Sequence, residues 1–151
     1  MLTGPSARKV VVTGAAGRLG GGIARVLRKQ GRLLAGVDIK PGPFVSHVLD
    51  LASCSTDALG TAFDGADAIV HAAAHPGPSA QSPAGWSEAA AAIATDAIGL
   101  EAADPVSVGA DNFAGTLRVY EAAGRQRSVR RVVFSSTAFT ADPKPTSSRS
   151  T

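Results

Sequence analysis

The feature that most constrains the fold is a set of three spaced glycines between a strand pattern and a helix pattern. KVVVTG, residues 9–14, is a short β-branched run ending in glycine, which is typical of a buried strand. Gly14, Gly17 and Gly20 follow within TGAAGRLG. A tight turn needs a residue without Cβ strain, and a helix N-terminus offers unpaired N–H groups to an anion. The stretch predicts a strand, a phosphate-binding turn and a helix; the alternative is a glycine-rich turn required only for packing.

An acidic residue at the end of the next strand pattern extends this interpretation. LLAGVD, residues 33–38, is a second strand pattern, and Asp38 lies close to the distance of about 20 residues at which a dinucleotide site places its ribose-binding acid. No Gly-Lys-Ser/Thr follows the glycines, which excludes a P-loop. A carboxylate at the ribose favours NAD and makes NADP less favoured, although Lys40 could weaken that preference. The alternative for Asp38 is a solvated acid at a strand end.

The rest of the sequence alternates between strand and helix patterns. Further strands are expected at residues 46–51, 67–74 and 130–137, and helices at residues 55–63 and 111–124. This order predicts an α/β fold of the Rossmann type, with a doubly wound, mainly parallel sheet of about five strands. Aromatic residues make up only 5% of the sequence, so the core must consist of Ala, Val, Leu and Ile.

Apolar residues at helical spacing predict which faces of two helices are buried. In the first helix the apolar positions are Leu19, Ile23, Val26 and Leu27. In the helix at residues 111–124, Phe113, Leu117 and Tyr120 share one face, and Tyr120 is expected in the core. The consecutive glycines at residues 20–22 would each cost a helix about 1 kcal/mol. Close packing on the sheet is expected to require one of them.

The middle and the end of the chain have a different composition. Residues 86–105 are alanine-rich and helix-prone, with Pro105 as the expected end of that helix. We expect an NAD(P)-binding domain at residues 1–140, with this alanine-rich insert at about residues 76–108. Residues 141–151 are rich in Ser, Thr and Pro and are expected to form a loose tail.

Composition excludes several other classes of protein. Charged residues make up 18% of the chain, as in ordinary globular proteins, and the net charge is only +3. The arginines at residues 118–131 lack the interleaved aromatic residues of a nucleic-acid site, so we expect a solvated patch and no nucleic-acid partner. No apolar run is long enough to span a membrane, and the first residues lack a secretory signal. Cys54 is the only cysteine, which favours a reducing, cytoplasmic location.

Metal and hydrolase sites are not indicated either. His47, His71 and His75 lack the spacing of metal ligands, and a packed or backbone-bonded role is expected for His71. No Gly-x-Ser-x-Gly elbow is present, which argues against a serine hydrolase.

Several of these motifs together resemble the extended short-chain dehydrogenase/reductases, the NAD-dependent epimerase/dehydratase family. The matching stretches, in order, are TGAAGRLG, the strand-end Asp38, the Asp50–Leu51 pair, VHAAA at residues 70–74, DNFAGTLRVYEAA at residues 111–123 and VVFSST at residues 132–137. They extend over most of residues 9–137, which is the N-terminal part of the family's pattern.

The resemblance implies a role for each matching residue. Around the pyrophosphate it places Gly14, Ala16, Gly17, Arg18, Leu19 and Gly20. Asp38 would bind the ribose, and Asp50 and Leu51 would lie against the adenine. The small residues Ala72, Ala73 and Ala74 would pass under the cofactor, with Asn112 and Ser135 also at the site. Thr137 matches the catalytic Ser/Thr that hydrogen-bonds the substrate; the alternative is a strand-end hydroxyl satisfied by the backbone.

The sequence also departs from the family's pattern. Catalysis in the family uses a Tyr-x-x-x-Lys pair downstream of the Ser/Thr, as general acid/base and its partner. The only tyrosine here is Tyr120, which precedes Thr137, and residue 124, four positions on, is glycine. The resemblance therefore implies an NAD-binding domain of an oxidoreductase acting on a sugar or nucleotide-sugar type substrate, truncated before the substrate domain and catalytically incomplete.

Two alternative interpretations stay open at this point. The chain could be a non-catalytic module that senses NAD or binds a partner, or a truncated gene product without a function of its own. A sheet that ends with the strand at residues 130–137 would leave an unpaired edge, and such edges pair with other chains. Self-association through this edge is therefore expected.

Overall fold

The computed structural model describes residues 8–74 and 105–135, which form five strands and three helices. The strands are β1 (Lys9–Thr13), β2 (Leu33–Asp38), β3 (His47–Val48), β4 (Ala68–His71) and β5 (Arg131–Phe134). The helices are α1 (Arg18–Lys29), α2 (Thr56–Phe63) and α4 (Pro105–Arg125). Thr137, the tail at residues 141–151 and most of the alanine-rich insert lie outside the described residues.

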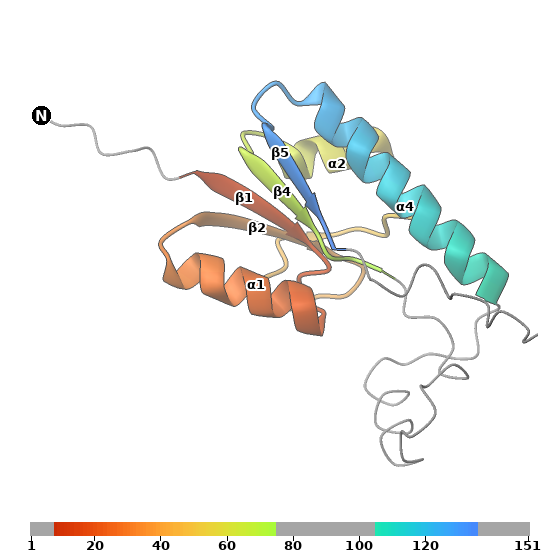
Figure 1. Cartoon of the computed structure of the whole chain (residues 1–151), viewed down its shortest axis with the longest axis horizontal. Coiled ribbons are helices and arrows are strands. Elements are labelled where there is room, and N and C mark those ends of the chain that lie inside the picture. The colour runs from red at the N-terminus through yellow and green to blue at the C-terminus, as the bar shows by residue number, and fades with distance from the viewer. Residues whose placement is uncertain (1–7, 75–104, 136–151) are drawn as a thin grey trace, which may run out of the picture.

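All five strands pair in parallel, in the order β3-β2-β1-β4-β5. The chain direction across the sheet reverses between β1 and β4, which is where doubly wound sheets bind their ligands. Helix α1 lies on one face of the sheet, while α2 and α4 lie together on the other (Figure 1). The predicted Rossmann-type fold, with its sheet of about five parallel strands, is confirmed.

The larger part of the core lies between the sheet and the pair α2 and α4. One register row crosses the four longer strands on this face, and its members are Ala35, Val11, Ile69 and Val132. Leu59 and Phe63 of α2 and Val119 of α4 pack onto it and are fully buried. The core is aliphatic apart from Phe63, as the low aromatic content predicts.

The opposite face of the sheet is covered unevenly. Its register row runs through Gly36, Val12, Val70 and Val133. Gly36 and Val12 are buried, Val70 is half-buried, and Val133 is 54% exposed. Helix α1 packs mainly over β1 and β2, so the described residues leave this face of β5 open to solvent. β5 is one of the two edge strands of the described sheet, and β3 is the other. The self-association predicted from the β5 edge stays a prediction, which concentration-dependent sedimentation would test.

The buried faces predicted for the helices are wrong in part. Leu19 of α1 is 53% exposed and Phe113 of α4 is 72% exposed, and Val26, Leu117 and Tyr120 are exposed as well. The residues that face the core are smaller. They are Gly20 and Ala24 in α1, and Val119, Ala122 and Ala123 in α4. Small residues let a helix approach the sheet closely. The face that carries them therefore packs on the sheet, and the face with larger apolar side chains stays exposed.

Several element boundaries also differ from the prediction. Helix α4 begins at Pro105, where the alanine-rich helix was expected to end. Proline fits both positions, because it follows helices and also favours the first helical position, where no N–H is needed. The third strand is reduced to His47–Val48, and the fourth and fifth strands end at His71 and Phe134.

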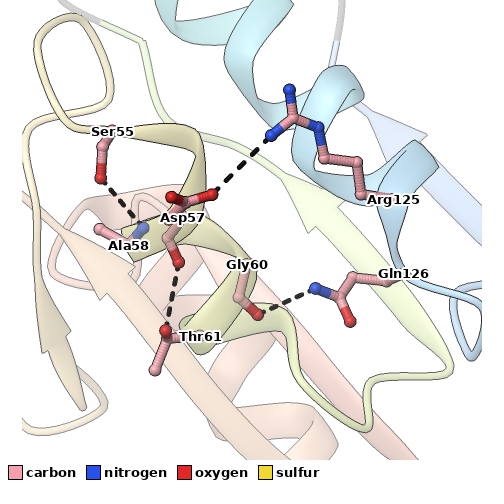
Figure 2. A network of polar contacts seen from close by, with 7 residues as sticks. All are labelled: Ser55, Asp57, Ala58, Gly60, Thr61, Arg125 and Gln126. Carbon is pink, nitrogen blue, oxygen red and sulfur yellow. Dashed lines mark hydrogen bonds and ion pairs between the residues drawn. The ribbon is translucent and has the colours of Figure 1, made fainter.

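Polar contacts join α2 to α4 on the surface (Figure 2). Gln126, just after α4, donates from Nε2 to the Gly60 carbonyl at 3.1 Å, and Arg125 lies 3.8 Å from the Asp57 carboxylate. Ser55 caps α2 by accepting from the Ala58 N–H. The ion pair is exposed, so it contributes less than about 1 kcal/mol. Asp57, Gly60, Arg125 and Gln126 also line a shallow cleft between the two helices.

The described residues contain neither a membrane-spanning helix nor a cluster of metal-binding side chains. No helix among them has the length and apolar character to cross a membrane. Nor do they contain a group of three or more His, Cys, Asp or Glu side chains suited to a metal ion.

Candidate functional site

The glycine turn after β1 is built by contacts that exclude side chains. Gly14 has a φ of 72°, in the left-handed region. A Cβ at Gly14 would lie 2.8 Å from the Ala73 nitrogen, and a Cβ at Gly20 would lie 2.1 Å from the Gly14 carbonyl oxygen. The turn is also anchored to β2, because the Gly14 and Ala15 N–H groups both donate to the Val37 carbonyl. These approaches hold the start of α1 tightly against the ends of β1 and β4.

The first turn of α1 presents free backbone donors at this position. Gly17 is the N-cap residue, and no side chain caps the helix. Helix geometry leaves the N–H groups of Arg18, Leu19 and Gly20 without intrahelical acceptors. The first turn contains no acidic residue, and Arg18 is exposed beside it. The arrangement attracts an anion through the N–H groups, the helix dipole and the Arg18 charge.

Asp38 is held at the rim of the same turn. Its Oδ2 accepts from the Ala16 N–H at 2.9 Å, and its Oδ1 accepts from the Lys40 N–H at 3.0 Å. These two bonds fix the carboxylate at the carboxyl end of β2. Each carboxylate oxygen accepts more than one hydrogen bond, so both can still receive hydroxyl donors from a ligand.

A buried hydrogen-bonded chain lies directly beneath the turn. His71 Nδ1 is 2.7 Å from Thr13 Oγ1, and His71 Nε2 is 3.0 Å from Thr116 Oγ1. The Ala73 N–H also donates to Thr13 Oγ1, at 3.3 Å. His71 is only 2% exposed, and burial lowers its pKa below the ordinary value. A neutral ring joins β1, β4 and α4 through the two threonine hydroxyls and fixes the backbone that passes Gly14.

The loop after β3 forms another wall near α4. Asp50 Oδ1 accepts from the Ala52 N–H at 2.9 Å, and Asp50 Oδ2 accepts from the Ser53 hydroxyl at 2.7 Å. Leu51 packs against Gly115 of α4, where a Cβ would lie 3.1 Å from the Leu51 Cβ. Asp50 therefore shapes its own loop in this structure, and Leu51 is placed by the helix.

The structure places most of the predicted site residues at the carboxyl end of the sheet. Ala72 and Ala73 lie against Gly14, Asp38 contacts the turn, and the Ser135 N–H donates to the His71 carbonyl at 3.0 Å. Asn112 lies on α4, about one helical turn before Gly115. Ala74 follows β4 and is exposed. Thr137 lies outside the described residues, and the ligand contacts of all these residues stay predictions.

Four residues of the site were not predicted as functional from the sequence. Thr13 and His71 are register partners in β1 and β4, so a polar pair at two neighbouring strand ends was a usable signal. Thr116 and Arg118 follow Gly115 on α4 and contact His71 and the loop after β3. Nothing in their local sequence marks these contacts, because their partners are 45 and 67 residues away.

Comparison with protein-family models gives one match relevant to this geometry. The model described as the NAD dependent epimerase/dehydratase family matches residues 10–97, which is more than half of the chain. A search of the curated proteins returned no match.

Several solved structures have the same fold as this chain. A short-chain dehydrogenase/reductase superfamily protein from Agrobacterium tumefaciens with bound NAD is 31% identical over 86% of this chain, with a TM-score of 0.61. Uronate dehydrogenase from the same organism is 25% identical over 86% of this chain, with a TM-score of 0.58. UDP-glucose 4-epimerase from Thermus thermophilus, in complex with NAD, is 25% identical over 85% of this chain, also with a TM-score of 0.58.

The similarity extends over only part of these structures. The chain covers 33% of the superfamily protein, 41% of uronate dehydrogenase and 37% of the epimerase. It therefore spans about two fifths of their length or less.

Proposed function

Because the chain belongs to the NAD dependent epimerase/dehydratase family, we propose that it forms the dinucleotide-binding domain of an oxidoreductase and takes NAD in preference to NADP. The observation that carries this proposal is the cradle formed by Gly14 and Gly20, which any Cβ would fill. The bound NAD in two of the similar structures supports the class of ligand. A bound nicotinamide would supply hydride transfer, while the residues of this chain bind and orient it.

The proposed contacts follow the geometry of the turn. The pyrophosphate lies at the free N–H groups of Arg18, Leu19 and Gly20, where the helix dipole favours negative charge. Asp38 accepts hydrogen bonds from the ribose hydroxyls. The adenine lies against Leu51 and Asp50. The small residues at positions 72–74 pass below the nicotinamide half of the cofactor, and Asn112 and Ser135 lie near it.

The preference for NAD rests on the position of Asp38. Two backbone N–H groups hold its carboxylate beside the turn, so it cannot move away from a ligand without losing both bonds. A ribose with free hydroxyls donates to this carboxylate, whereas the additional phosphate of NADP places two negative charges close together. Lys40 follows two residues later and offsets a part of that repulsion.

We also propose that these 151 residues bind the cofactor without carrying out the family's reaction. Tyr120 is the only tyrosine, it is exposed on α4, and glycine occupies residue 124, where the Tyr-x-x-x-Lys pattern has lysine. A complete protein of this family would act on a sugar or nucleotide-sugar type substrate, with Thr137 as a hydrogen-bond donor to it. The names of uronate dehydrogenase and UDP-glucose 4-epimerase support this substrate class.

Titration with NADH and NADPH tests the proposal. Nicotinamide fluorescence would follow binding to the purified chain and to its Asp38→Ser variant. We expect saturable binding of NADH and at least about tenfold weaker binding of NADPH, because one unfavourable charge contact costs about 1.4 kcal/mol or more. The Asp38→Ser variant should lose this preference. Absence of NADH binding by the folded chain, or an equal preference in the wild-type chain, would contradict the proposal.

A further inference from the structure

The loop after β3 has one shape, fixed by its own hydrogen bonds. The Asp50 carboxylate accepts from the Ala52 N–H and from the Ser53 hydroxyl, and the Cys54 N–H donates to the Asp50 carbonyl at 2.7 Å. The backbone N–H groups of the loop donate to neither the Leu51 carbonyl nor the Ala52 carbonyl. A second element must satisfy these two carbonyls, because both belong to half-buried residues.

Arg118 of α4 provides that second element. Its Nη1 donates to the Ala52 carbonyl and, at 3.5 Å, to the Leu51 carbonyl. The guanidinium is planar and carries five donors in a fixed arrangement, so one side chain can hold two neighbouring carbonyls. Three residues earlier on the helix, Gly115 receives the Leu51 side chain. Helix α4 therefore holds the loop in two ways. Leu51 packs on Gly115, and Arg118 binds the two carbonyl groups, an interaction called the Arg118 clamp below.

The clamp also fixes the distance between two parts of the proposed site. Asp50 and Leu51, against which the adenine is proposed to lie, are called the adenine wall here. Asn112 lies six residues before Arg118 on α4. Six residues of α-helix span about 9 Å. A rigid link between Arg118 and the loop therefore fixes the distance between the adenine wall and Asn112, which lies near the nicotinamide in the proposed site.

We propose that Arg118 is a positioning residue that holds the adenine wall of the dinucleotide site. This inference rests on the proposed NAD-binding function, since it assigns a determinant of the same site. Arg118 does not contact the ligand in this account. It acts through the backbone of Leu51 and Ala52, which it keeps in the shape that receives the adenine.

Cys54 is a built-in reporter for this loop. Burial raises the pKa of the Cys54 thiol above its usual value, the Arg118 cation acts in the opposite direction, and the Asp50 carboxylate adds to the increase. Alkylation measured across pH gives both the thiol pKa and the limiting rate of the thiolate. The first reports the proximity of the Arg118 charge, and the second reports access to the loop.

The test compares Arg118→Met with Arg125→Met. Both variants remove an arginine from α4, but Arg125 faces Asp57 of α2 and not the loop (Figure 2). In Arg118→Met we expect the Kd for NADH to rise about tenfold, which corresponds to the loss of one charge-assisted hydrogen bond. Binding of reduced nicotinamide mononucleotide, which lacks the adenine, should be unchanged. Arg118→Lys should recover part of the loss, and Arg125→Met should bind both ligands as the wild-type chain does.

The thiol measurement separates failure of this inference from failure of the proposed function. Without any ligand, Arg118→Met should raise the Cys54 pKa and increase the limiting alkylation rate several-fold, while Arg125→Met should change neither. If the wild-type chain binds no NADH, the proposed function fails, and an altered Cys54 profile would still support the clamp. An unchanged Cys54 profile would overturn the inference. Equal weakening of both nicotinamide ligands would overturn it too, because that result indicates a general loss of structure.

Discussion

His71 is enclosed by two threonine hydroxyls and the Phe134 ring, whose centroid lies 5.5 Å from that of His71. Its burial disfavours the charged imidazolium and lowers the pKa. In the unfolded chain the same imidazole takes up a proton near its ordinary pKa of 6.5. Below that pH the unfolded state therefore binds more protons than the folded state, and folding is opposed.

We predict that the free energy of unfolding falls as the pH is lowered from 7 to 5, because of His71. The stabilisation is fully present above about pH 6.5 and is lost as the pH approaches the lowered pKa, with a slope of up to about 1.4 kcal/mol per pH unit. Urea unfolding at several pH values measures it. His71→Gln should be less stable at pH 7 and should have a shallower slope than the wild-type chain. A wild-type slope in His71→Gln would refute the assignment.

The glycines at residues 20–22 differ in what they do for α1. A Cβ at Gly20 would meet the Gly14 carbonyl oxygen at 2.1 Å, whereas a Cβ at Gly22 would have no neighbour within 4 Å. Of the three glycines, Gly20 is the one that close packing requires most strictly. Gly21 is intermediate, with the Ala15 carbonyl oxygen at 3.2 Å.

Alanine substitutions two positions apart should therefore have opposite effects. Gly22→Ala should raise the free energy of unfolding by about 1 kcal/mol, because alanine favours the helix and meets no steric obstacle. Gly20→Ala should lower it by a few kcal/mol and weaken NADH binding, because the turn must move. Denaturant unfolding of the two variants measures both changes. Stabilisation by Gly20→Ala would show that the close approach to Gly14 is not maintained.

At the level of elements, the sequence predicted the strands better than the helix surfaces. β2 was predicted with its observed bounds, and β1 within one residue, because short apolar runs beside glycine or proline are local signals. The contact face of a helix is not a local property. Phe113 and Leu117 have core-like spacing, yet Gly115 and Val119 face inward because α4 lies close to the loop after β3 and to the sheet.

The candidate site shows the same division. The glycine turn and Asp38 were predictable, because each lies at a strand end with a recognisable spacing. The contact from His71 to Thr116 was not, because it joins residues 45 positions apart, whereas Thr13 and His71 carry a usable signal as polar residues at two neighbouring strand ends. Arg118 was interpreted only as part of a solvated arginine group. Its role depends on two carbonyl groups that no sequence pattern marks.

In the whole molecule, the parallel topology brings the predicted cofactor-binding segments together at the carboxyl ends of the strands. The turn after β1, Asp38 at the end of β2, the loop after β3 and residues 72–73 after β4 all lie at the carboxyl ends of neighbouring strands. The cleft between α2 and α4 is lined by other residues, including Thr56, Gly60 and Asp64, and shares none with the proposed cofactor contacts. We therefore predict that the dinucleotide binds at the carboxyl ends of the strands and not in this cleft.

The most direct test is an NMR titration of the isotope-labelled chain with NADH, followed at assigned backbone amides. We expect the largest shift changes at residues 14–20, at Asp38 and at residues 72–73. The amides of Asp57, Gly60 and Gln126 in the α2–α4 cleft should change little. Saturable binding with changes concentrated in that cleft, or a folded chain whose spectrum NADH does not alter, would contradict the account.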